Sequence, residues 1–215
     1  MARIDHLIGG IYRISTFAPE KRISFNQFLI DDDAPALIHT GAFPMYADVR
    51  AAIAQVLDPS RLRYVVVPHF EADECGGMGR FVAEAPQAVL ACSLVGARIN
   101  LSQWDYAGPF QDMQDGDVLD LGKHRLRFWE TPHVHHWDSM MVVEETTASL
   151  FPADLFHSTK RATSYRQRES GGGYVRMVSN RWHIWWRGPR LACCWSCRAA
   201  CPSLGPPDAR RQPAR

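Results

Sequence analysis

Short segments with strand-like and helix-like spacing alternate along the first 178 residues of this 215-residue chain. Runs rich in β-branched and aromatic residues, bounded by Gly, Pro or Asp, predict strands. The clearest are "GIYRIST" (10–16), "FNQFLID" (25–31), "ALIHTG" (36–41), "RLRYVVVP" (61–68) and "QAVLACS" (87–93). The polar turn "DDDAP" separates the second of these runs from the third.

Helices and hairpins are predicted at the remaining positions. In "PMYADVRAAIAQVL" (44–57), apolar residues recur near helical spacing after a proline that a first helical turn tolerates, and "GGMGRFVAEA" (76–85) opens a second helix. Residues 115–132 predict a hairpin that turns at Gly122–Lys123, and residues 139–156 predict another with a polar bend. This order of units predicts an α/β fold with helices packed outside sheets.

The pattern ends at Ser179. Residues 179–215 sustain neither a helical nor a strand period, and they hold seven Arg and one acid in a chain whose formal charge is +1. We therefore expect one folded domain over 1–178 and a poorly structured tail over 179–215. The tail's four cysteines could bind zinc or shuttle electrons, but they are too crowded to form the two spaced ligand pairs of a structural zinc site.

Composition narrows the class of protein. A net charge of +1 argues against a dedicated nucleic-acid or membrane-surface binder. The N-terminal residues show no signal-peptide pattern, and no apolar run is long enough to predict a membrane span. A cytoplasmic location follows as the default, with Cys75 and Cys92 reduced and no disulfide framework.

Three segments carry metal-ligand residue types at the point where a predicted strand gives way to a loop. They are His69-x-Glu71-x-Asp73, then "TPHVHHWDSM" with His133, His135 and His136, and then "LFPADLF" with Asp154. Each alone has an ordinary alternative: a polar loop, a solvated histidine loop and a helix N-cap. Together they predict a metal site, because all three segments follow the end of a strand, where α/β folds usually place their functional residues.

The donor types favour particular ions. Carboxylates brought within a few ångströms of one another repel, and a cation removes that conflict. The predicted ligands are oxygen and nitrogen donors without a thiolate: the carboxylates of Glu71, Asp73 and Asp154, and two imidazoles. Such a set suits iron or manganese, whereas structural zinc prefers Cys and His.

These motifs resemble the metallo-β-lactamase superfamily and, within it, the oxygen-binding di-iron domain of flavodiiron proteins. The resemblance covers about residues 5–178, through "FNQFLI", "DPSRLRYVVVPHFEADECGGM", "TPHVHHWDSM" and "LFPADLF". It implies an αββα sandwich, here incomplete at its C-terminal end, and a site of two iron ions, with zinc or manganese as alternatives. By resemblance, the first iron is held by His69, Glu71 and His135, Asp73 holds the second, and Asp154 joins the two.

The resemblance implies a protein that binds or reduces O₂ or NO. The chain has no room for a flavodoxin domain, so it is expected to bind no flavin itself and to take electrons from a separate flavoprotein or other carrier. Three alternatives remain: a metal-dependent hydrolase, a non-catalytic gas sensor and an inactive relative. Glu71 disfavours the hydrolase, because hydrolases of the superfamily carry a second His at that position.

The chain departs from the family pattern at three places. Glu74 stands where the motif commonly carries His, and His136-Trp137 stands where Trp-Pro is usual, so His135 and His136 both remain candidates. The family's final His ligand is missing, and the surroundings of His183 do not fit it. A change of reading frame near Ser179 would explain this loss and the altered composition, and the nucleotide sequence would test it.

Overall fold

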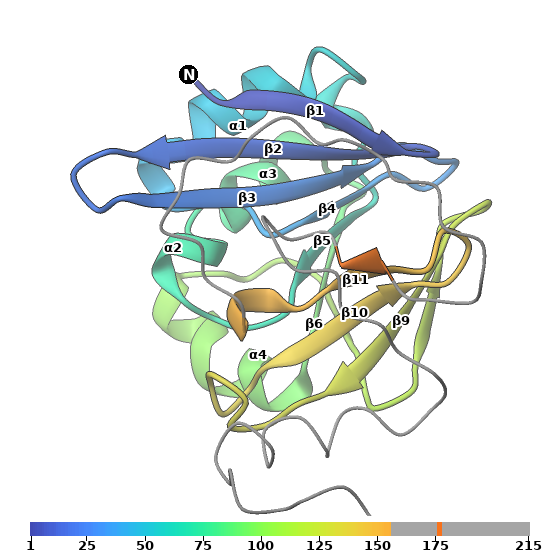
Figure 1. Ribbon diagram of the computed structural model, residues 1–215. Helices are drawn as coiled ribbons and strands as arrows, with labels where there is room; N and C mark the ends of the chain where they lie inside the picture. The colour runs from blue at the N-terminus through green and yellow to red at the C-terminus, as the bar shows by residue number, and fades with distance from the viewer. Residues whose placement is uncertain (156–175, 178–215) are drawn as a thin grey trace, which may run out of the picture.

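Two β-sheets pack face to face in the computed structural model, which describes residues 1–155 and 176–177 (Figure 1). The seven-stranded sheet has the order β1 (Arg3–Ile8), β2 (Ile11–Ala18), β3 (Ile23–Ile30), β4 (Ala36–Ile38), β5 (Tyr64–Val67), β6 (Val89–Cys92) and β7 (Phe110–Asp112). Its first four strands pair antiparallel, and β4 to β7 pair parallel.

The second sheet consists of β12 (Arg176–Met177), β11 (Ser149–Phe151), β10 (Met140–Glu144), β9 (Arg125–Glu130) and β8 (Val118–Asp120), in that order. It is built from the two predicted hairpins, β8–β9 and β10–β11, with β12 added in parallel to β11. Leu119, Leu126, Phe128, Val142 and Phe151 of this sheet are buried in the core between the two sheets.

Strand β5 shows why the central strands are apolar throughout. Successive side chains of a strand point to opposite faces. Val65 and Val67 are buried in the core on the helix side, and Val66 is buried between the sheets. Both faces are dry, so "YVVV" carries no alternation, as expected of a parallel strand covered on both sides.

Helices α1 (Tyr46–Ile53), α3 (Met78–Glu84) and α4 (Leu94–Asn100) contact strands of the seven-stranded sheet, and α2 (Ala72–Cys75) is a single turn after β5. Short 3₁₀ segments are η1 (Phe43–Met45), η2 (Pro59–Arg61), η3 (Leu101–Trp104) and η4 (Ala153–Leu155). Among the described helices, none is long and apolar enough to cross a bilayer.

The predicted strands, hairpins and α/β class are confirmed. The helix expected over 44–57 is shorter: it starts as η1, and α1 ends at Ile53. Strands β1 and β7 and helix α4 were not predicted. The expected tail over 179–215, with His183 and the cysteine cluster, lies outside the described residues, so the division at 178 stays a prediction.

Asp32 links the turn after β3 to the β8–β9 hairpin. Its fully buried carboxylate accepts hydrogen bonds from the backbone N–H groups of Lys123 (3.1 Å) and His124 (2.7 Å), and from the His124 ring (2.7 Å). Burial raises the pKa of the Asp32 carboxyl, but these bonds and one from the Asp33 N–H outweigh it, so the pKa lies below its usual value.

We expect Asp32→Asn to lower the free energy of unfolding at pH 7 by about 1–3 kcal/mol, because an amide cannot accept all these bonds. A carboxyl with a depressed folded-state pKa stabilises above its unfolded pKa, and this stabilisation is lost as the pH falls through the folded value. The difference from wild type should therefore shrink below about pH 4. Denaturant unfolding from pH 7 to pH 2 checks this, with the exposed Asp33→Asn as control.

Candidate metal centre

The predicted ligand segments meet at one end of the two sheets. Strand β5 runs into Pro68 and His69, the β9–β10 connection spans 131–139, and β11 leads into η4. The Met140 N–H donates to the Pro68 carbonyl at 2.9 Å, which joins the start of β10 to the end of β5. Segments far apart in sequence are thereby held side by side.

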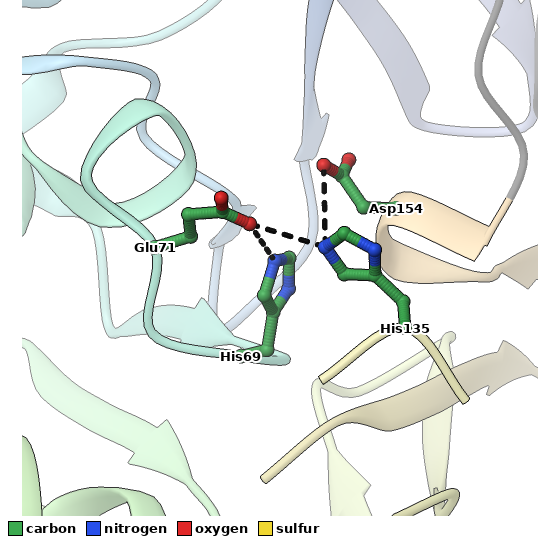
Figure 2. Close-up of side chains that lie close together, drawn as sticks. All are labelled: His69, Glu71, His135 and Asp154. Carbon is green, nitrogen blue, oxygen red and sulfur yellow. Dashed lines mark hydrogen bonds and ion pairs between the residues drawn. The ribbon is translucent and has the colours of Figure 1, made fainter. Parts of the chain in front are cut away.

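Four of the five predicted ligands form a compact group. His69, Glu71, His135 and Asp154 each offer one ligand atom, and these atoms all lie within 4.8 Å of one another. Figure 2 shows both imidazoles pointing at the same Glu71 oxygen: Nε2 of His69 lies 3.3 Å and Nε2 of His135 lies 3.1 Å from Oε2. Oδ2 of Asp154 lies 3.9 Å from Nε2 of His135.

The group lies between the core and solvent. The His69 side chain is fully buried, whereas 45% of Glu71 and 30% of His135 is exposed. Burial lowers the pKa of His69. The pKa of the Glu71 carboxyl is also lowered, because the hydrogen bonds from His135 and His69 outweigh the effect of partial burial, which would raise it. Neutral imidazole and ionised carboxylate, the forms that bind metals, are therefore favoured at these two positions.

Left-handed backbone conformations gather around the group. His135 has φ = 81°, Ala153 beside Asp154 has φ = 50°, and His39 has φ = 60°. Each costs about 1–3 kcal/mol for such residues and persists only where the surrounding structure imposes it. Strain of this kind is typical of functional sites.

Asp73, the fifth predicted ligand, lies in the first turn of α2, partly buried and outside the group of four. His133 is exposed. The His136 ring contacts Asp138 through Nδ1, so the geometry favours His135 over His136 as the residue facing Glu71. Whether these residues bind metal stays a prediction.

His39 was not predicted and lies beside the group. It follows β4 directly, is buried, and its ring centroid is 6.1 Å from that of His69. Nδ1 of His39 contacts the buried carboxylate of Glu74. Burial lowers the pKa of His39 to about 4, although Asp154 and Asp73 raise it. The histidine that follows "ALI" becomes a signal only once β4 is known to lie parallel to β5, because the residues after the two strands then lie at the same edge of the sheet.

A cation fits the four-residue group by its chemistry. The donors are two imidazole nitrogens and two carboxylate oxygens. Such donors bind first-row divalent metals, iron among them. Cys75, close in sequence, is buried, and burial raises the pKa of its thiol to about 12, so it is a packing residue rather than a thiolate donor.

Known proteins share the sequence pattern. A nitric oxide reductase of Moorella thermoacetica is 31% identical over 143 residues, 65% of this chain and 35% of the relative. A rubredoxin-oxygen oxidoreductase of Megalodesulfovibrio gigas is 27% identical over 158 residues, 70% of this chain and 39% of the relative. The chain thus spans well under half of these relatives.

Solved structures share the fold. The flavodiiron protein from Giardia intestinalis superposes with a TM-score of 0.69 at 22% identity, over 76% of this chain and 42% of that one. The metal-soaked Flv1 flavodiiron core from Synechocystis superposes with a TM-score of 0.60 at 26% identity, over 70% of this chain and 41% of that one. The family model described as ODP family beta lactamase matches residues 23–182. Because residues 23–182 make up most of this chain, the chain belongs to the ODP family of beta lactamases.

Proposed function

We propose that this chain is the metal-carrying part of a flavodiiron-type protein, holds two iron ions, and binds or reduces O₂ or NO. The observation that carries the proposal is the convergence of Glu71 with His69, His135 and Asp154. A carboxylate at position 71 sets this donor group apart from the zinc sites of superfamily hydrolases. The names of the relatives, a nitric oxide reductase and a rubredoxin-oxygen oxidoreductase, support the same class of substrate.

In this proposal His69, Glu71 and His135 hold the first iron, Asp73 the second, and Asp154 links them. Bound iron would supply open coordination positions for a small gas and would pass electrons to it from an external donor. The chain's own contribution is placement: the buried His69 fixes the inner side, and the half-exposed Glu71 and His135 leave the outer side open to gas and protons. Electrons are expected from a separate flavoprotein or another redox carrier.

A cytoplasmic setting is part of the proposal. Cys75 and Cys92 are both buried free thiols, and burial raises the pKa of each to about 12. Such thiols are inert and suit a reducing compartment.

Metal analysis of protein purified without oxygen tests the proposal. We expect about two irons per chain, an optical change on adding O₂ or NO, and gas consumption with a reduced flavin donor. An optical change without turnover would indicate a sensor. Zinc together with esterase activity would indicate a hydrolase, and a chain that retains no metal would be an inactive relative.

A further inference from the structure

Asp138 lies between the two loops that carry the proposed ligands of the first iron. Its side chain is fully buried. Oδ2 accepts a hydrogen bond from the backbone N–H of Phe70 at 3.1 Å, and Oδ1 contacts Nδ1 of His136. Phe70 directly follows His69, and His136 directly follows His135. One carboxylate therefore touches the neighbour of a ligand on each loop.

We propose that Asp138 is a positioning residue that sets the distance between His69 and His135, and through it the affinity for the first metal. The inference rests on the proposed function in one respect only, the identity of the metal ligands. Partners that orient ligand residues without touching the metal typically change metal affinity 10-fold to 100-fold when removed.

The rest of the β9–β10 connection is fastened mainly to itself. The His136 N–H donates to Ser139 Oγ at 3.1 Å, and the Thr131 N–H donates to the Ser139 carbonyl at 2.9 Å. These bonds shape the loop without reaching His69. The Met140 N–H bond to the Pro68 carbonyl joins the loops one residue before His69, so the Asp138 side chain supplies the link on the far side of the ligand.

Helix α4 holds the carboxylate from behind. A Cβ added to Gly96 would lie 2.9 Å from Asp138 Oδ2, 2.9 Å from the Phe70 ring and 2.8 Å from Ser93 Oγ. Real Cβ atoms do not approach so closely, so a side chain at position 96 must move at least one of these groups. A substitution at Gly96 can therefore disturb the contact between Asp138 and Phe70 without replacing a proposed ligand or Asp138 itself.

The first test compares Asp138→Ala with Asp138→Asn by anaerobic titration of metal-free protein with ferrous iron. Asparagine can accept the Phe70 N–H through its oxygen and donate through its nitrogen to Nδ1 of the other His136 tautomer, so it keeps both links while removing the charge. We expect the alanine variant to bind iron about 10-fold to 100-fold more weakly and the asparagine variant to stay within about 3-fold of wild type.

The second test uses Gly96→Ala, with Gly79→Ala as its matched control. Gly79 is also helical, but an added Cβ there meets nothing within 4 Å. We expect iron affinity to fall about 10-fold in the Gly96 variant and to stay unchanged in the Gly79 variant. If Asp138→Ala fails to fold, this pair and the asparagine variant still decide the matter.

A third measurement needs no metal. Hydrogen exchange of the Phe70 amide should be slow in wild type and Asp138→Asn and faster in Asp138→Ala, with the Val66 amide of β5 unchanged. Iron affinity unaltered in Asp138→Ala and Gly96→Ala would overturn the inference, as would an asparagine variant as weak as the alanine one. If wild type binds no iron, the proposed function fails, and the Phe70 amide still reports on the link.

Discussion

If His135 holds the first iron as we propose, its replacement with asparagine is expected to weaken iron binding by at least about 100-fold, since loss of a ligand should cost no less than loss of the group that orients it. The Nε2 atom of His135 lies 3.1 Å from Glu71 and 3.9 Å from Asp154. The shorter side chain of asparagine cannot carry a donor atom to that position. Asparagine also tolerates the left-handed backbone of residue 135, so the loop should keep its shape.

His133→Asn is the matched control. His133 belongs to the same loop, has a similar left-handed backbone with φ = 63°, and is exposed. The two variants therefore share the substitution and the backbone conformation and differ in which ring faces the carboxylates. Iron titration and metal content after anaerobic purification should separate them clearly. Equal losses in both variants, or none in His135→Asn, would show that His135 is not a ligand.

The fold was predictable where one pattern determines one element. The short, β-branched run "YVVV" favours a strand buried on both faces, and the β8–β9 and β10–β11 hairpins follow from apolar runs around polar bends. Strand β1 was missed because "RIDHLI" has only one buried residue, Leu7, at an edge of the sheet. Its pattern is too weakly apolar to be distinguished from a loop.

The site was predictable only in part. His69 and Glu71 are two residues apart after one strand, so their proximity is local. His135 and Asp154 were candidates from their positions after predicted strands, and the family resemblance then singled out His135 and assigned each its role. Nothing in the sequence showed that Asp138 would reach Phe70, because that contact depends on how the two sheets meet. His39 was missed for the same reason: it becomes informative only once β4 is known to lie beside β5.

Glu74 and His39 have to be interpreted together. Where the family motif commonly carries His, this chain carries a carboxylate whose side chain is only 8% exposed, and a buried carboxylate requires a partner. His39, 5% exposed, contacts it, and the backbone N–H groups of Thr40 and Gly41 donate to the Glu74 carbonyl at 2.8 and 3.1 Å. The end of β4 is thereby fastened to α2, the helix that carries Asp73.

Glu74→Ala is accordingly expected to lower the free energy of unfolding by about 1–3 kcal/mol, because it leaves the buried, neutral ring of His39 without its polar partner. Glu145→Ala is the control, since the exposed Glu145 pairs with Arg127 at the surface and its loss should cost about 1 kcal/mol or less. Glu74→His should be as damaging as Glu74→Ala, because it sets two imidazoles against each other in a buried space. Denaturant unfolding of metal-free protein measures all three.

The decisive variant exchanges the pair. Glu74→His combined with His39→Asp restores one carboxylate and one imidazole, and aspartate tolerates the left-handed backbone at position 39. We expect the double variant to recover at least about half of the stability that Glu74→His loses, a coupling of roughly 0.5–1.5 kcal/mol between two residues in contact. If the losses in free energy of unfolding of the two single variants add in the double variant, Glu74 is stabilised by other groups and His39 has a separate role beside His69.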